Sequence, residues 1–113
     1  MNIEEVRELC LSFEHVEECT PFDEVTLVYK VYGKMYALLA LYQMLFNVKC
    51  DPEKAIELRE VYTFVTPGFH MNKKHWNTVD YTLASKSQIV EWLNDSYQLV
   101  RSRIPRSKRN KEQ

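Results

Sequence analysis

The segment from Pro67 to Val79 carries more polar and aromatic chemistry than any other stretch of the chain. Behind a Pro67-Gly68 pair it holds two histidines, two lysines, two asparagines and a tryptophan. Proline fixes one backbone angle near that of a turn and the glycine after it can take a positive φ, so the pair predicts a chain reversal. Lysine and asparagine side chains interleaved with aromatic rings can pair with phosphates and stack on bases. A local function is therefore expected in this segment.

The candidate nucleic-acid contacts are polar or aromatic residues of this segment, a lysine on a strand beside it, and cations near the C-terminus. They are Lys49, Asn72, Lys73, Lys74, His75, Trp76, Asn77, Arg106, Lys108 and Arg109. Several also have a structural explanation. A tryptophan in a strand more often packs in the sheet than stacks on a base. A lysine pair suits a solvated turn, and an asparagine can cap a short turn.

Metal and thiol chemistry are alternatives that the sequence supports less well. His70 and His75 lie on a predicted turn with no third ligand nearby in sequence, so we expect structural histidines and no metal site. Cys10, Cys19 and Cys50 lack the C-x-x-C pairing of zinc and redox sites, so we expect reduced thiols and place Cys50 in the core. A Cys50 nucleophile with a histidine as its base would need the fold to bring the two together.

Motifs of the common enzyme classes are largely absent. The two glycines, Gly33 and Gly68, cannot supply a P-loop or a dinucleotide-binding G-x-G-x-x-G, and the chain has no G-x-S-x-G elbow. We therefore expect a non-enzymatic protein that needs no cofactor.

Length and composition fit a single domain. A chain of 113 residues with 45% hydrophobic content can build one core but is too short for two. The N-terminus has no basic region followed by an apolar run, and no apolar stretch approaches the ~20 residues needed to cross a bilayer. We expect a soluble, cytoplasmic protein that is monomeric and does not bind membranes.

Charge is divided unevenly along the chain. Residues 1–100 carry nine Lys/Arg against fifteen Asp/Glu, whereas residues 101–113 carry six against one. We expect residues 1–104 to form the domain and residues 105–113 to form a basic, flexible tail. Cations of the tail could neutralise phosphates and give salt-sensitive nucleic-acid binding. The alternative is a solvated, frayed terminus.

Hydrophobic spacing predicts a helix at each end of the domain. Residues 3–13 place apolar side chains at three- and four-residue steps, opposite Glu4, Glu5 and Glu8. Near the C-terminus, Ser85 and Gln88 predict a capping box at the start of a long helix, which Pro105 stops. The buried side of that helix is predicted to carry Ile89, Trp92, Leu93, Ser96, Tyr97, Val100 and Ile104.

Alternating and β-branched residues predict about five strands between these helices. The predicted strands cover residues 26–32, 34–41, 45–50, 62–66 and 75–83. Asp51-Pro52 predicts the start of a short helix that ends near Glu60. This order predicts an α+β two-layer sandwich, in which an antiparallel sheet carries the N- and C-terminal helices on one face. The other face would be open, with Asn47 and Lys49 among its polar side chains.

The run from Pro67 to Trp76 resembles the signature of the MmcQ/YjbR family of small bacterial proteins. Segments 20–22, 33–38, 49–52 and 96–100 also match the family's pattern in the same order, so the resemblance covers about the first hundred residues. It implies a frataxin-like (CyaY-like) fold and a double-wing DNA-binding role. The acidic face of the first helix is similar to that of iron-binding frataxins, although surface helices commonly carry such glutamates.

DNA binding is accordingly the expected function, through the open sheet face, residues 67–79 and the basic tail. The alternative is a protein- or small-ligand-binding module of the same fold with no nucleic-acid role. A DNA-binding surface needs a continuous positive patch, whereas a ligand module needs an apolar or mixed pocket.

Overall fold

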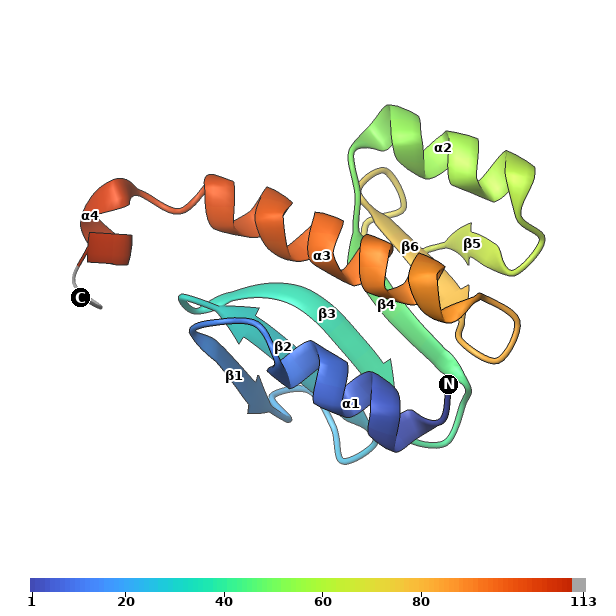
Figure 1. The fold of residues 1–113 in the computed structure, drawn as a ribbon, viewed down its shortest axis with the longest axis horizontal. Coiled ribbons are helices and arrows are strands. Elements are labelled where there is room, and N and C mark those ends of the chain that lie inside the picture. The colour runs from blue at the N-terminus through green and yellow to red at the C-terminus, as the bar shows by residue number, and fades with distance from the viewer. Residues whose placement is uncertain (111–113) are drawn as a thin grey trace.

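An antiparallel sheet forms one layer of the protein. In the computed structural model, which describes residues 1–110, it contains six strands in the order β1-β2-β3-β4-β6-β5 (Figure 1). The strands are β1 Val16–Cys19, β2 Thr26–Val31, β3 Lys34–Ala40, β4 Leu45–Lys49, β5 Val65–Pro67 and β6 Trp76–Asp80. The helices are α1 Ile3–Leu11, α2 Pro52–Val61, α3 Lys86–Ser102 and α4 Arg106–Asn110.

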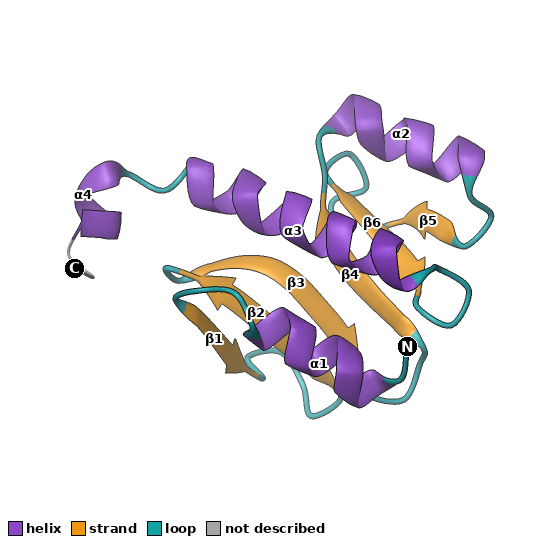
Figure 2. Cartoon of the chain, in the orientation of Figure 1, coloured by secondary structure: helices purple, strands orange, loops and turns teal. Residues whose placement is uncertain are grey.

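The first and last long helices cover the same face of the sheet, as the sequence predicts (Figure 2). The ring of Phe13, just after α1, stacks on Tyr97 of α3 with centroids 4.7 Å apart. Val6 of α1 and Leu93 of α3 are fully buried in one core cluster with the inward residues of the strands. All the side chains predicted for the buried side of the last long helix are buried: Ile89, Trp92, Leu93, Ser96, Tyr97, Val100 and Ile104. This arrangement leaves the other face of the sheet without a helix.

The predicted helix starts are confirmed by their caps. Ser85 and Gln88 form the capping box of α3, and the Asp51 carboxylate accepts from the backbone N–H groups of Glu53 and Lys54 at the start of α2. These side chains satisfy N–H groups that have no partner inside the helix. Both helices therefore begin where the sequence indicates.

The β2–β3 hairpin turns through Tyr32 and Gly33, which both have positive φ, at 48° and 81°. Two such residues in a two-residue loop make a type I′ turn, whose twist matches that of the strands. The Tyr32 ring stacks on His15 with centroids 4.8 Å apart. Tyr32 thus combines this ring contact with a positive φ, which residues other than glycine seldom adopt.

The sheet differs from the prediction of about five strands in two places. Strand β1 is additional, and it pairs with β2 although its Glu17 and Glu18 break any apolar alternation. Glu18 is held by the Arg7 guanidinium and the Tyr29 hydroxyl. Strand β5 begins only at Val65, because Tyr62 ends α2 and Phe64 packs its ring near Trp92.

Beyond Pro105, residues Arg106–Asn110 form the short helix α4, an element that the sequence did not predict within the basic tail. Ile104, just before it, is buried and belongs to the main core. Lys111, which adds to the positive charge of the tail, lies outside the described residues. Within residues 1–110, no helix combines the length and the apolar character needed to span a bilayer.

Candidate functional site

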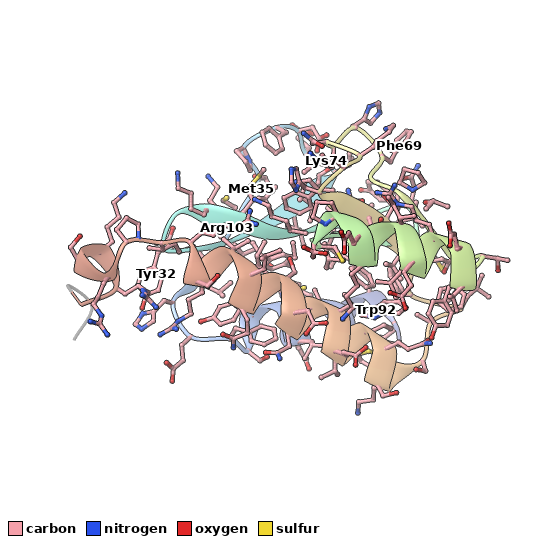
Figure 3. The ribbon with its side chains drawn as sticks, turned by 90° about the horizontal axis from the view of Figure 1, so that it is seen from above. Tyr32, Met35, Phe69, Lys74, Trp92 and Arg103 are labelled. Carbon is pink, nitrogen blue, oxygen red and sulfur yellow. The ribbon has the colours of Figure 1, made fainter. Side chains whose placement is uncertain are left out.

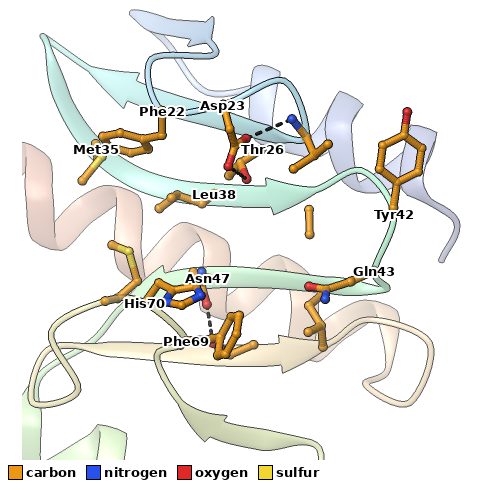
Figure 4. Close-up of a pocket in the computed structure, with 15 residues that line it drawn as sticks. Phe22, Asp23, Thr26, Met35, Leu38, Tyr42, Gln43, Asn47, Phe69 and His70 are labelled. Carbon is orange, nitrogen blue, oxygen red and sulfur yellow. Dashed lines mark hydrogen bonds between the residues drawn. The ribbon is translucent and has the colours of Figure 1, made fainter.

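The open face of the sheet is hollowed into a groove with a volume of about 720 Å³. Its floor comes from β2, β3, β4 and β6, and its two walls come from the loop before β2 and the loop between β5 and β6 (Figure 4). Phe22 on one wall and Phe69 on the other are 64% and 56% exposed, and Tyr42 at one end is 84% exposed. Three large rings thus stand in solvent around a concave surface.

The floor of the groove is mainly apolar. Val28, Leu38 and Trp76 form a small buried cluster on this face, with Met35 and Met71 packed against it. Leu38, Ala40 and Leu45 line the groove itself, and Met35 and Met71 line it beside the cluster. The lining residues, all of which the structure describes, include no lysine or arginine; they include the carboxylate of Asp23 and the imidazole of His70.

Asp23 is engaged by its own loop. Its carboxylate accepts from the backbone N–H of Val25 at 2.9 Å and from the Thr26 hydroxyl at 3.3 Å. These bonds hold the loop that carries Phe22 against the start of β2. Hydrogen bonds within the loop therefore hold the wall that carries Phe22 in place.

A chain of hydrogen bonds crosses the floor between the opposite wall and β4. The backbone N–H of Phe69 donates to the Thr78 hydroxyl at 2.8 Å, and that hydroxyl donates to Oδ1 of Asn47 (Figure 4). In this arrangement the single proton of the Thr78 hydroxyl goes to Asn47, and the amide oxygen of Asn47 faces Thr78. Asn47 is only partly buried, and its Nδ2 group has no partner among the described residues.

The chain reversal at Pro67-Gly68 requires a glycine because Gly68 packs closely against Trp76. A Cβ on Gly68 would lie 2.7 Å from the Trp76 Cβ and 3.0 Å from the Trp76 carbonyl oxygen. The positive φ expected at the glycine is found instead at His70, at 58°. Asn72 caps a short turn, which is the structural explanation that the sequence offered for it. Its Oδ1 accepts from the Lys74 N–H at 2.9 Å.

Arg59 of α2 anchors the far end of this loop. Its guanidinium donates to Oδ1 of Asn77 at 2.6 Å, to the Trp76 carbonyl at 3.2 Å and to the Lys73 carbonyl. Asn77 in turn donates to the Ala55 carbonyl and is 1% exposed, while Trp76 is 6% exposed. The structure thus buries Trp76 and Asn77, a placement that suits positioning the segment rather than touching bases.

The remaining nucleic-acid candidates of the segment lie nearer the surface. Asn72, Lys73 and Lys74 are exposed, and His75 is partly buried. The Lys73 ammonium donates to the Gly68 carbonyl at 3.0 Å, so one of the two lysines also closes its own loop.

Lys49 pairs in register with Trp76 at the end of β4. Burial lowers the pKa of its ammonium, and the nearby positive charge of Arg103 lowers that pKa further. Two cations close together favour an anion between them.

The tail candidates lie away from the lysine pair. Arg106 and Lys108 are exposed on α4 and Arg109 is partly buried. Figures 1 and 3 both show α4 beyond the C-terminal end of α3, and Figure 3 shows Phe69 and Lys74 on another part of the molecule, well away from α4. The sequence-predicted contacts therefore form two separate groups.

The thiols and histidines do not assemble a reactive site. Burial raises the pKa of Cys10 to about 12 and raises the pKa of Cys50, whereas a nucleophilic thiol needs a lowered pKa. Cys50, expected in the core, is only half-buried, and Cys10 occupies the core instead. The backbone N–H of Cys50 donates to the His75 carbonyl, but no hydrogen bond joins the thiol to an imidazole among the described residues. Within residues 1–110 no three His, Cys, Asp or Glu side chains are grouped to hold a metal ion.

Comparison with known proteins agrees with the signature in residues 67–76. The YjbR family model matches residues 11–99. The chain belongs to the YjbR family. Uncharacterised protein YbdF of Escherichia coli O157:H7 is 35% identical over 100 residues, which cover 86% of this chain and 82% of YbdF. Uncharacterised protein YjbR of Escherichia coli K12 is 31% identical over 113 residues, which cover 96% of this chain and 95% of that protein.

Solved structures of similar proteins share the fold of this YjbR-family chain. The crystal structure of Deinococcus radiodurans protein DR2400, with a DUF419 domain, is 34% identical with a TM-score of 0.90, covering 97% of this chain and 86% of that one. A Pseudomonas syringae protein at 24% identity has a TM-score of 0.76, covering 88% of this chain and 98% of that one, and shows the fold alone.

Most of the groove was not predictable from the sequence. The alternating pattern placed Asn47 on the open face but gave no role to Phe22, Phe69 or Thr78. The available signal was the register, because the β4–β6 ladder sets Asn47 opposite Thr78. That pairing joins strands separated by α2 and β5, so it was not visible in local spacing.

Proposed function

We propose that this YjbR-family protein is a non-enzymatic binding module that holds a small, neutral and largely apolar molecule in the groove of its open sheet face. The observation that carries the proposal is the groove itself: a concavity of about 720 Å³ with an apolar floor, a few convergent polar groups and no lysine or arginine among its lining residues. Sites for small molecules typically have this size and this mixture of groups.

Charge favours such a ligand over nucleic acid in the groove. Duplex DNA is bound largely through its phosphates, and single strands are bound by aromatic stacking inside a positively charged groove, so both usually require lysine or arginine side chains along the contact. The groove offers instead exposed rings and aliphatic side chains, which gain from being covered by an apolar partner.

We expect Ala40→Trp to abolish binding in the groove without unfolding the protein. Ala40 lines the groove at the end of β3 and is partly exposed, so an indole there can fill space that a ligand would use. Naphthalene serves as the probe, and its binding is followed by ¹⁵N chemical-shift changes. Wild type should show saturable shifts confined to the groove residues, and Ala40→Trp should weaken the affinity at least about tenfold.

The matched control is Glu57→Trp, which adds the same ring to an exposed position of α2. It should leave naphthalene binding and the melting temperature unchanged. Wild-type protein that gives no saturable shifts, or shifts spread over the whole surface, would contradict the proposal.

DNA binding is the second candidate function that we propose. It includes the double-wing role and the frataxin-like relationship, which the family resemblance implies. The observation that favours it is the exposed pair Lys73 and Lys74 in the β5–β6 loop, together with the cations of α4, which form a separate group. Lys49 beside Arg103 could receive a phosphate between the two groups.

For this candidate, the double variant Lys73→Ala and Lys74→Ala should keep its melting temperature, since exposed charges contribute little to stability. It should weaken duplex binding at low salt for all DNA sequences. A chain ending at Pro105 tests the tail while keeping the buried Ile104, and the removal of each phosphate-binding cation should reduce the log-log salt slope by about 0.9. Fluorescence anisotropy with labelled duplex measures both effects. Absence of salt-sensitive binding by wild type at tens of micromolar, a usual non-specific affinity, would exclude this role.

A further inference from the structure

We infer that the groove selects planar aromatic molecules that carry a hydrogen-bond acceptor, such as a carbonyl oxygen or an unprotonated ring nitrogen, and that Asn47 is the residue that recognises this acceptor. The inference rests on the proposed function, because it names the chemical class that the same groove takes.

The hydrogen-bond chain across the floor runs in one direction and ends at Asn47. The Phe69 N–H donates to Thr78, and Thr78 donates to Oδ1 of Asn47. With the amide oxygen toward Thr78, the two N–H donors of Asn47 point away from it. An acceptor on the ligand would pair with Nδ2, which has no partner among the described residues, whereas Thr78 already uses one of the two lone pairs of the amide oxygen.

Asn47 also lies where a ligand would cover it. It is on the floor between the two walls, with Leu38 on the neighbouring strand and Thr78 on the other side (Figure 4). A ligand that covers this apolar floor removes water from the amide. A donor that loses water without gaining an acceptor costs free energy, so the site discriminates against molecules that lack one.

The walls of the groove determine the shape and charge of the ligand. Phe22 and Phe69 stand on opposite walls and are both more than half exposed, so their rings are available to contact the faces or edges of a flat aromatic ligand. The lining has no lysine or arginine, the Asp23 carboxylate is engaged by its own loop, and the His70 imidazole is the remaining ionisable nitrogen, so the groove lacks the cluster of like charges that binds a strongly charged ligand. A neutral acceptor is the polar group that fits.

The experiment compares quinoline with naphthalene, two planar molecules of the same shape that differ by one acceptor nitrogen. The measured quantity is the ratio of their dissociation constants, which cancels the contribution of the apolar floor. In wild type, quinoline should move a side-chain NH₂ proton of Asn47 downfield, the sign of a new hydrogen bond, whereas naphthalene should give that proton only a ring-current shift. In Asn47→Leu and in Asn47→Asp, the affinity of quinoline relative to naphthalene should fall about twofold to tenfold, the usual net value of one hydrogen bond.

The two variants keep the test decisive. Asn47→Leu removes the donors but leaves the buried Thr78 hydroxyl without its acceptor, which lowers stability. Asn47→Asp keeps the size and the acceptor for Thr78 while replacing the donors by a second oxygen. Gln43→Glu is the matched control, because Gln43 is another amide that lines the groove but lies exposed in the β3–β4 turn. It should leave the ratio unchanged.

The outcomes separate the inference from the proposed function. If naphthalene and quinoline both bind wild type but the ratio is the same in folded Asn47→Asp, the groove is a ligand site and the role of Asn47 is wrong. If neither molecule binds wild type, the proposed function fails and the inference fails with it. A ratio that falls equally in Gln43→Glu also overturns the assignment to Asn47.

Discussion

Leu93→Ala should lower the free energy of unfolding by about 2 to 5 kcal/mol. Leu93 is fully buried in the middle of α3, in the core cluster that also contains Val6 of α1 and Phe46 of β4. Alanine would remove apolar atoms from water-free surroundings and leave a cavity that the packed helices and sheet can close only in part. Urea unfolding followed by tryptophan fluorescence measures the change, since Trp92 lies next to the site in sequence.

Val90→Ala is the matched control for this prediction. Val90 lies on the same helix but is 38% exposed, so its truncation should change stability within about 0.5 kcal/mol. A loss below about 1 kcal/mol for Leu93→Ala would mean that α3 does not press its apolar side onto the sheet as the structure has it.

The helices were the most predictable part of the fold because their signals are local. The Ser85 and Gln88 capping box and the apolar spacing from Ile89 to Val100 lie within α3; the helix ends at Ser102, before the predicted stop at Pro105, and Ile104 is buried in the turn after it. Strand β1 was missed because what stabilises it is not local. Its Glu18 faces Arg7 of α1 and Tyr29 of β2, and only the folded chain brings those partners to a pair of adjacent glutamates.

The segment from Pro67 to Val79 was rightly singled out by composition, yet its residues have roles that composition does not reveal. Trp76 and Asn77 are buried, and Asn77 is held by Arg59 of another helix. Besides its exposed polar residues, the segment contributes Phe69 to the wall of a groove whose other wall lies more than forty residues earlier in the chain. Such a site follows from strand order, which local spacing does not determine.

Gly68→Ala should lower the free energy of unfolding by about 1 to 3 kcal/mol and also weaken ligand binding in the groove. A Cβ there would lie 2.7 Å from the Cβ of Trp76, which is too close, and 3.0 Å from its carbonyl oxygen. Neither atom is the far end of a flexible side chain. The loop must therefore move, although the Gly68 N–H is bonded to the Trp76 carbonyl at 2.9 Å and the Gly68 carbonyl accepts from the Met71 N–H.

Gly33→Ala is the control that separates the loss of stability expected for Gly68→Ala from its loss of ligand binding. Gly33 has a φ of +81° and nothing within 4 Å of an added Cβ, so alanine there costs about 1 to 2 kcal/mol of backbone strain in a turn whose two residues do not line the groove. Both variants should therefore lose stability in urea, but only Gly68→Ala should lose affinity for naphthalene, because only Gly68 precedes Phe69 on the groove wall. Equal naphthalene affinities in the two folded variants would show that the wall formed by residues 68–71 takes no part in binding, and the ligand site would then have to lie on the strands and the wall that carries Phe22.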